Sequence, residues 1–271
     1  MEKEVPKFLE EMLLKDYGEE LKNEIINGYK KNKKLTFRVN TLKANKEKIK
    51  SRLKEENIIF KEVPWYEDAF IIENVKEDAI RKLDIYENGE IYLQSLSSMI
   101  PPLILDPKAN ENILDMASAP GGKTTQISAL SNNEVMITAC EKNKIRLERL
   151  KFNIEKQGAR VNVLMEDSRK LDNFFSFDKI LLDSPCSGSG TENVYDKKFT
   201  KELIERSTKT QIELLKKGIN ILKPRRRNNI FNLFSIKGRK WRSNKTSIKK
   251  RKDWPCKNRW RLSKGSTQTS K

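Results

Sequence analysis

The chain lacks histidine altogether, has few cysteines and contains no long apolar run. Without histidine there can be no histidine general base, no Ser-His or Cys-His pair and no imidazole metal ligand. The three cysteines, Cys140, Cys186 and Cys256, have no metal-type spacing, which favours a reducing cytoplasm over a disulfide framework or a metal site. No segment is apolar enough to cross a bilayer, and no signal segment opens the chain. We therefore expect a cytoplasmic protein with no membrane partner and no metal.

Acidic residues are almost missing from one region of the chain. The formal net charge is +18, but residues 225–271 carry 17 Lys and Arg and a single acid, Asp253. The first 224 residues therefore hold 39 bases and 37 acids, a net charge of +2. Because the excess lies in one tail, the overall charge indicates little about what the folded part binds.

The hydrophobic pattern divides the chain into three parts. Residues 1–92 predict a small α+β module, with helices at 8–26 and 46–56 and strands at 35–42, 58–63 and 70–72. Residues 93–224 predict a parallel sheet, because from residue 111 short strands alternate with helices. The expected strands are 113–114, 135–139, 161–165 and 179–182, and the expected helices begin after 123 and span 144–157 and 200–222. In helix 144–157 the apolar set is Ile145, Leu147, Leu150 and Ile154, and Gly158 ends it. Residues 225–271 form the basic tail.

A glycine-rich turn follows the first strand of the second part. Gly121 and Gly122 permit a close backbone approach, and the helix that begins there offers free N–H groups to a carboxylate. Glu141 and Asp167 follow later strands, where acids can accept hydrogen bonds from ribose hydroxyls and an adenine amine. A phosphate-binding P-loop is the alternative, but its motif needs glycine where this chain has Ala117. The turn therefore favours a nucleoside-like ligand.

Residues 183–190 place Cys186 on a tight turn directly after an apolar strand. The carboxyl end of a parallel strand is where open α/β sheets bind their ligands. The alternative is a small apolar filler, since free cysteine is often buried. The Asp-x-Pro-Cys-Ser-Gly context favours a functional thiol over that alternative.

The two motifs together resemble the S-adenosylmethionine-dependent RNA cytosine-C5 methyltransferases of the bacterial rRNA and NOL1/NOP2/Sun type, over roughly residues 30–224. The resemblance implies an α/β fold: a Rossmann-like class I S-adenosylmethionine-dependent methyltransferase core with a small N-terminal α+β module. It also implies a monomer that acts on RNA, rRNA before tRNA, with S-adenosyl-L-methionine as cofactor. The implied cofactor-binding residues are Ala117, Ser118, Ala119, Pro120, Gly121, Gly122, Lys123, Glu141, Asp167 and Asp183.

The resemblance also implies an RNA-binding set in and after the module. These residues are Arg38, Asn40, Gln94, Ser97 and Ser98. For Arg38 and Asn40 the alternative is a solvated strand edge, and for Glu141 and Asp167 it is a pair of ordinary strand-end acids.

The implied catalytic residues are Asp183, beside the target base, and Cys186, which assists product release in the resembled family. The nucleophile of that family lies in a Ser-Thr-Cys element at the end of the following strand, whereas DNA cytosine-C5 methyltransferases attack with their Pro-Cys thiol. This chain has no Thr-Cys after Pro224. The family nucleophile is therefore absent, and we expect impaired activity unless Cys186 takes over the attack.

A frame change beside Pro224 accounts for both the missing motif and the missing acids. Residues 225–234 can be written in codons that, read one base later, encode Gly-Gly-Glu-Ile-Ile-Tyr-Ser-Thr-Cys. On this hypothesis residues 225–271 are a translated artefact, disordered, with the last strands missing or altered, although Ile230-Phe231 and Leu233-Phe234 can still fill the fifth-strand position. The alternative is a genuine basic arm on a non-catalytic RNA-binding protein, with Trp241, Trp254 and Trp260 stacking on bases.

Overall fold

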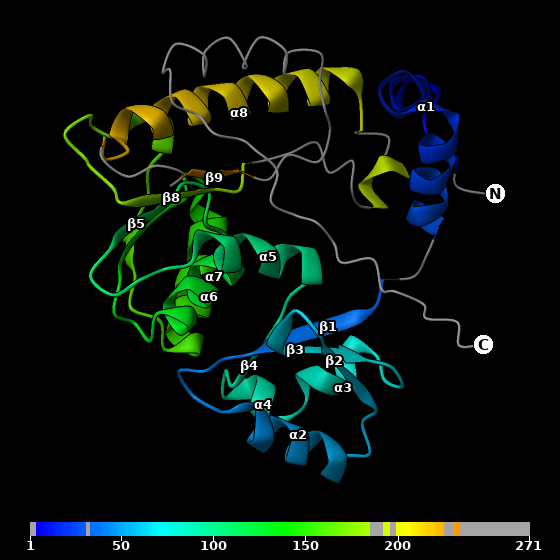
Figure 1. Cartoon of the computed structure of the whole chain (residues 1–271), viewed down its shortest axis with the longest axis vertical. Coiled ribbons are helices and arrows are strands. Elements are labelled where there is room, and N and C mark those ends of the chain that lie inside the picture. Colours follow the sequence, from blue (N-terminus) through cyan, green and yellow to red (C-terminus); the bar gives the residue numbers. More distant parts are fainter. Residues whose placement is uncertain (1–3, 31–32, 185–191, 196–198, 225–229, 233–271) are drawn as a thin grey trace, which may run out of the picture. The chain divides into compact units, whose positions relative to one another are not determined.

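The computed structural model describes residues 4–30, 33–184, 192–195, 199–224 and 230–232, which are organised around two sheets (Figure 1). Residues up to 235 belong to one unit, so both sheets lie within it. In the described part of the chain, no helix combines the length and the apolar content that a membrane crossing requires.

The first sheet is antiparallel, with strand order β2-β3-β1-β4. After a leading helix the elements follow the order β-α-β-β-α-α-β, which confirms the predicted α+β module. Its elements are α1 (Lys7–Lys30), β1 (Leu35–Val39), α2 (Lys46–Glu55), β2 (Phe60–Val63), β3 (Tyr66–Ile72), α3 (Glu77–Arg81), α4 (Asp84–Glu87) and β4 (Ile91–Leu93).

The two faces of the first sheet bury different kinds of residue. Phe37 and Val39 of β1 pack with Ile49 and Leu53 of α2 in the module's own core. Because successive side chains of a strand point to opposite faces, Arg38 lies on the other face of the sheet. That face packs against α5 (Leu96–Leu105), which leads into the second sheet.

The second sheet is parallel, with strand order β7-β6-β5-β8-β9. Its strands are β5 (Asn112–Asp115), β6 (Met136–Cys140), β7 (Asn162–Leu164), β8 (Lys179–Leu182) and β9 (Ile230–Asn232). This order confirms the predicted parallel sheet. The chain runs outward from β5 in both directions, and such a switch point is where ligands bind in open α/β sheets.

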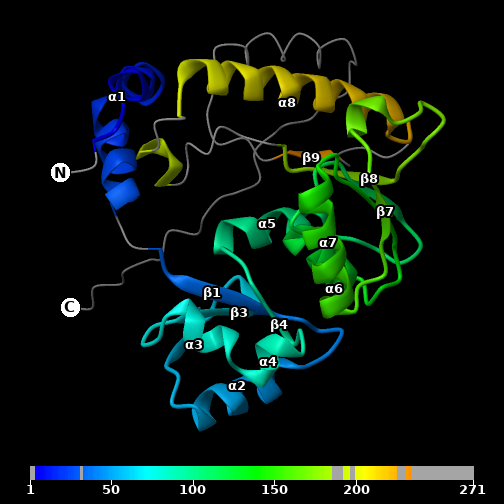
Figure 2. The ribbon, with the colours of Figure 1, turned by 180° about the vertical axis from the view of Figure 1, so that it is seen from behind.

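Helices cover both faces of the parallel sheet (Figures 1 and 2). One face, with Ile113 and Ile137, packs against α5, α6 (Gly122–Leu130) and α7 (Lys144–Gln157). The opposite face, with Leu114 and Ile180, packs against α8 (Lys201–Ile221). Two short 3-10 helices, η1 (Ser168–Lys170) and η2 (Glu192–Tyr195), lie in the connections before and after β8.

Helix α7 has the bounds that the sequence predicts. The side chain of Asn143 accepts the N–H of Arg146 at the first turn, and Gly158, with φ of 66°, ends the helix. The expectation that Ile145 faces the core is wrong, since its side chain is 69% exposed. Ile145 lies across the helix from the buried side chains of Leu150 and Ile154, because 3.6 residues make one turn.

Strand β9 occupies the position next to β8. It pairs in parallel with Ile180 opposite Ile230 and Leu182 opposite Asn232. The prediction that Ile230-Phe231 fills the fifth-strand position is therefore confirmed. Leu233-Phe234, the rest of the tail and Cys186 lie outside the described residues.

Candidate active site

Four acids follow four neighbouring strands at one edge of the parallel sheet. Asp115 ends β5, Glu141 follows β6, Asp167 comes after β7 and Asp183 follows β8. Because all five strands are parallel, these carboxyl ends lie at the same edge. The sheet thus brings together acids that are up to 68 positions apart in sequence.

Asp115 stabilises the loop between β5 and α6 through hydrogen bonds. Its carboxylate accepts hydrogen bonds from Thr124 Oγ1 at 2.7 Å and from the Ala117 N–H at 3.3 Å. Complete burial raises the pKa of Asp115 to about 6, although the Thr124 hydrogen bond opposes the shift. Gly121 precedes the helix with φ of 109°, a conformation that favours glycine. A closed turn therefore presents the first N–H groups of α6 to the carboxyl edge.

Two side chains of helix α7 donate hydrogen bonds to the same loop. Arg146 donates from Nη2 to the Ala119 carbonyl at 2.7 Å, and its Nη1 lies 3.3 Å from Glu141 Oε2. Asn153 donates to the Pro120 carbonyl at 2.8 Å, and the peptide bond between Ala119 and Pro120 is cis. The side chains of one row of α7 thus fix the loop and one of the strand-end acids together.

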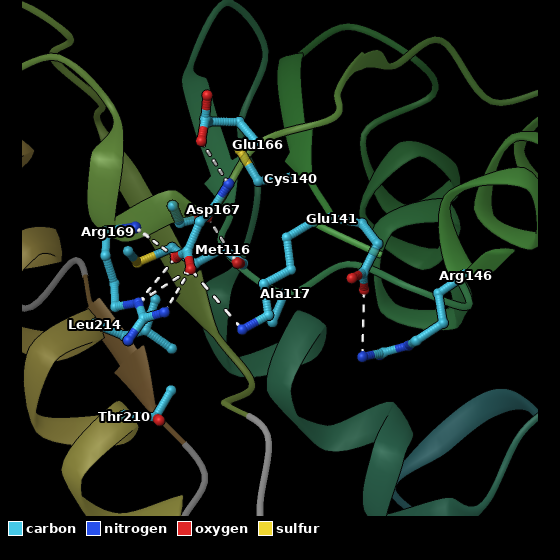
Figure 3. Close-up of a pocket in the computed structure, with 12 residues that line it drawn as sticks. Met116, Ala117, Cys140, Glu141, Arg146, Glu166, Asp167, Arg169, Thr210 and Leu214 are labelled. Carbon is cyan, nitrogen blue, oxygen red and sulfur yellow. Dashed lines mark hydrogen bonds and ion pairs between the residues drawn. The ribbon is translucent and has the colours of Figure 1, made fainter. Parts of the chain in front are cut away.

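A small cavity of about 40 Å³ lies between Glu141 and Asp167 (Figure 3). Glu141 is buried and accepts the N–H of Asn143 at 2.8 Å. Hydrogen bonds from Arg169 lower the pKa of Asp167 to about 2, so its carboxylate is an ionised acceptor at neutral pH. Two fixed acceptors beside the backbone of Ala117 suit a ligand with hydroxyl and amine donors, such as a ribose and an adenine. An adenosyl group has to displace lining side chains to enter this volume.

A second cavity, of about 240 Å³, lies on the other side of the loop. Its wall includes Lys123, whose ammonium lies 2.6 Å from Asp183 Oδ2 and donates to Ser98 Oγ at 2.8 Å. Lys123 lies in the first turn of α6, Asp183 follows β8 and Ser98 belongs to α5. The ion pair therefore joins the glycine loop, the tip of β8 and the helix next to the module at one cavity.

Arg38 of the module is fully buried and contacts the residues that follow the glycine loop. Its guanidinium donates to Gln94 Oε1 at 2.9 Å, to Thr125 Oγ1 at 2.8 Å and to the Gly122 carbonyl at 3.3 Å. The ring of Tyr92 lies 5.1 Å from the guanidinium carbon, and a Cβ on Gly122 would come within 3.0 Å of that ring. Two module side chains thus determine the shape of the loop's last turn.

Asn40 makes a second connection between the module and the parallel sheet domain. Its amide donates to the Gly89 carbonyl and to the Gln157 carbonyl at the end of α7, both at 2.8 Å. Since Arg38 and Asn40 are both fully buried, the alternative of a solvated strand edge is wrong for each, and the same burial leaves neither side chain exposed for the predicted contact with RNA.

The structure brings most of the predicted cofactor residues together. All except Gly121, which lies behind them against Leu150, line one of the two cavities, and Ala117 lines both. Of the predicted RNA residues, Gln94 and Ser98 line the larger cavity and Ser97 is exposed.

Sequence reasoning missed Tyr92, Arg146 and Arg169. Arg146 carried a usable signal, because it lies in the first turn of the helix that follows Glu141, five positions further along the chain. Arg169, two residues after Asp167, carried a similar local signal. Tyr92 had none, since its neighbour Gly122 is distant in sequence.

Comparisons with known proteins agree with this geometry. The family described as "16S rRNA methyltransferase RsmB/F" matches residues 102–229, and the "Methyltr_RsmF/B-like, ferredoxin-like domain" matches residues 5–77. A solved structure, a methyltransferase homolog protein from Pyrococcus horikoshii, is 34% identical with a TM-score of 0.72, covering 82% of this chain and 71% of its own. The chain belongs to the RNA cytosine-C5 methyltransferase family of the bacterial rRNA and NOL1/NOP2/Sun type.

Further relatives of this methyltransferase family define how much of the chain is shared. The ribosomal RNA small subunit methyltransferase F of Shewanella sp. (strain ANA-3) is 36% identical over 198 residues, which is 70% of this chain and 41% of the relative. The chain thus spans about two fifths of the length of the curated relatives that it matches. NSun6 from Pyrococcus horikoshii, solved with SFG, shares the fold with a TM-score of 0.79 at 23% identity, over 90% of this chain and 87% of its own.

Proposed function

We propose that this chain is built to bind S-adenosyl-L-methionine and to methylate carbon 5 of a cytosine in RNA, rRNA in the first place. The observation that carries the proposal is the Lys123–Asp183 ion pair, with 2.6 Å between the charged atoms at the wall of the 240 Å³ cavity. It joins the two sequence motifs that characterise the family. We further propose a cytoplasmic monomer, with residues 1–92 and 93–224 as its module and catalytic domain.

The chain's own groups fit the cofactor, which supplies an electrophilic methyl group when bound. We assign the methionine part to the loop 117–123, the ribose to Glu141 and the adenine amine to Asp167. The buried Glu141 and the ionised Asp167 support this, as does the NSun6 structure with SFG, an analogue of S-adenosylmethionine.

Cofactor binding is testable without any turnover. Titration calorimetry with S-adenosylhomocysteine should give roughly 10- to 100-fold weaker binding for Glu141→Ala, since charge-assisted hydrogen bonds contribute about 1.5–3 kcal/mol. Glu148→Ala removes an exposed acid from helix α7, which follows Glu141, and should leave the affinity unchanged. Equal affinity of the two variants would remove Glu141 from the site.

The chemistry requires a thiolate, because C5 of cytosine is a weak nucleophile. Addition of the thiolate sulfur to C6 would turn the ring into an enamine, whose C5 is nucleophilic enough to take the methyl group that the bound cofactor would supply. Loss of the C5 proton and expulsion of the thiolate then release the product. With no histidine in the chain, Asp183 and Lys123 are the ionisable pair next to the base position that we assign to proton movements.

We infer that this chain is impaired, because the residue after β9 is leucine. Strand β9 ends at Asn232, which is level with Leu182, the residue before Asp183. A nucleophile one residue further along would follow the strand next to Asp183, and codons can be chosen for residues 225–234 that, read one base later, encode a cysteine at position 233. Nucleotide sequencing across the Pro224 codon tests the frame change directly: codons that cannot yield Thr-Cys one base later would refute it.

Restoring the motif tests the impairment in the protein. With an RNA that carries 5-fluorocytosine, Asn232→Thr combined with Leu233→Cys should form a denaturant-resistant covalent adduct that the parent chain lacks. If the parent forms the adduct and Cys186→Ser abolishes it, Cys186 is the attacking thiol, as in the DNA enzymes. An equal yield from the parent and Cys186→Ser would exclude that role.

A non-catalytic RNA-binding protein is the second candidate, favoured by the 17 basic residues and three tryptophans of 225–271. Deleting 225–271 distinguishes the two. Loss of RNA binding, in a protein that never transferred methyl groups, favours the binding protein. Retained RNA binding together with cofactor binding favours the methyltransferase.

A further inference from the structure

The outer face of α7 carries exposed apolar side chains interleaved with cations. Ile145, Arg149, Phe152 and Lys156 are spaced by four, three and four positions, which places them on one face of a helix. The side chains of Ile145 and Phe152 are 69% and 62% exposed, and Arg149 is exposed as well. We call these four residues the outer stripe. Its apolar members cannot be explained by the core, which α7 meets with its opposite face.

The outer stripe lies in one of two strongly basic segments of the described chain. Residues 142–160 hold seven Lys and Arg and two acids, a net charge of +5. The first 224 residues have a net charge of +2, so the rest of them sum to −3. The other basic segment, residues 33–54, holds nine Lys and Arg and one acid, a net charge of +8, and its Lys43 contacts the C-terminal end of α7.

The C-terminal end of the outer stripe meets a cation cluster on the module. The Lys156 ammonium lies 3.9 Å from the centre of the Tyr86 ring and 5.9 Å from that of Phe152. Arg81 lies 5.1 Å from the same tyrosine ring, and Lys43 donates to the Lys156 carbonyl at 2.7 Å. Partial burial lowers the pKa of Lys156, and the charges of Arg81 and Lys43 add to that effect.

Two acids moderate this cluster without neutralising it. Glu77 accepts hydrogen bonds from Arg81, and the charge of Glu87 opposes the lowering of the Lys156 pKa. Lys156 and Lys43 have no carboxylate within ion-pair distance among the described residues. An anion placed against them would offset charge that the fold leaves crowded.

The outer stripe also lies next to the cofactor loop. The neighbouring row of α7 contains Arg146 and Asn153, which hold the Ala119 and Pro120 carbonyls. Helix α7 has 14 residues and is therefore about 21 Å long, from the rim of the smaller cavity to the module. A chain of nucleotides lying on the stripe would run from the module to the edge of the cofactor site.

We propose that the outer stripe and the cation cluster around Tyr86, formed by Arg81, Lys43 and Lys156, bind a single-stranded segment of the substrate RNA that flanks the target base. Arg149, Lys156 and Lys43 contact phosphates, and the exposed ring of Phe152 stacks on a base. The inference rests on the proposed function and adds to it the path by which the RNA reaches the site.

Site-resolved crosslinking on the full chain tests this path. A 12-nucleotide single-stranded RNA with 4-thiouridine is irradiated with the protein in the presence of heparin, which competes for the basic tail. Peptide mass spectrometry should find crosslinks at Tyr86 or Phe152, reduced at least fivefold in the double variant Arg149→Ala/Lys156→Ala. The control, Lys144→Ala/Lys151→Ala, removes the same charge from another face of α7 and should change these crosslinks less than twofold.

The salt dependence of affinity provides an independent readout. Loss of two phosphate contacts should reduce the slope of log K against log salt by about 1.4 in Arg149→Ala/Lys156→Ala, and leave it unchanged in the control. Crosslinks confined to residues 225–271 and the segment around Asp183, or equal slopes for the two double variants, would overturn the proposal. If S-adenosylhomocysteine still binds in that case, the proposed function stands and only this RNA path fails.

Discussion

Single side chains of the module decide which residues the glycine loop can contain. The backbone of Gly122 has an ordinary helical conformation, yet a Cβ there would come within 3.0 Å of the Tyr92 ring. The glycine is thus required by a neighbouring side chain, whereas Gly121, with φ of 109°, is required by the backbone itself.

The effect of Gly122→Ala on the free energy of unfolding is therefore expected to depend on the residue at position 92. It should change sign when Tyr92 is replaced. Alanine improves helix propensity by about 1 kcal/mol, whereas overpacking against the ring costs about 1–3 kcal/mol. With Tyr92 present the substitution should lower the free energy of unfolding or leave it unchanged. In a Tyr92→Ala background it should raise that free energy by about 1 kcal/mol. Urea denaturation of the four proteins measures this, and the same effect in both backgrounds would exclude the steric explanation.

Asp115 should make stability depend on pH. Burial raises its pKa to about 6 from the ordinary 3.8, so the folded state holds its proton more tightly than the unfolded state. The stability from this group is complete below pH 3.8 and is lost as the pH rises through 6. Two pKa units correspond to roughly 3 kcal/mol.

Asp115→Asn removes this titration while keeping an oxygen for the Thr124 hydroxyl. Relative to the parent, the variant should gain stability between pH 5 and pH 8. Denaturation curves of both proteins at the two pH values provide the check. A difference in unfolding free energy that is independent of pH would show that Asp115 does not titrate in this range.

At the scale of elements, local signals predicted bounds and distant contacts decided the exceptions. Helix α7 was predicted at both ends because Asn143 and Gly158 act on their own turns. Strand 35–42 was predicted too long, since β1 ends at Val39. At that point Asn40 turns to the Gly89 and Gln157 carbonyls, 49 and 117 positions away.

The site shows the same division between local and distant information. The loop and the strand-end acids could be predicted, because their motifs are continuous in sequence. The role of Arg38 as a buried support could not, because its partners Gly122 and Thr125 are 84 and 87 positions away. Nothing in the sequence next to Arg38 reveals that its face of the sheet will be covered.

Arg38→Met should destabilise the contact between the module and α6. The substitution leaves Gln94 Oε1 and Thr125 Oγ1 without this donor, and each unsatisfied buried group costs about 1–3 kcal/mol. We expect a loss of about 2–4 kcal/mol in unfolding free energy and weaker binding of S-adenosylhomocysteine. The control Arg206→Met changes an exposed residue of α8 and should stay within about 0.5 kcal/mol. Similar losses for both would mean that the network contributes little.

At the scale of the whole molecule, the parallel sheet ends early within the described residues. Strand β9 has three residues and no strand paired on its far side in that part of the chain. A short last strand leaves backbone groups unpaired and reduces the apolar area that the sheet buries.

The chain should consequently be marginally stable or prone to aggregate. Scanning calorimetry combined with light scattering should show a broad transition at low temperature, accompanied by scattering. A sharp, cooperative transition at high temperature from a clear solution would contradict this.

The contact between Tyr92 and Gly122 makes a residue of the parallel-sheet domain depend on a residue of the N-terminal module. A recombination event that joined residues 94–224 to a different N-terminal module would keep the glycine loop but remove the Tyr92 ring that contacts it. Glycine would then no longer be required at position 122, and alanine could replace it there.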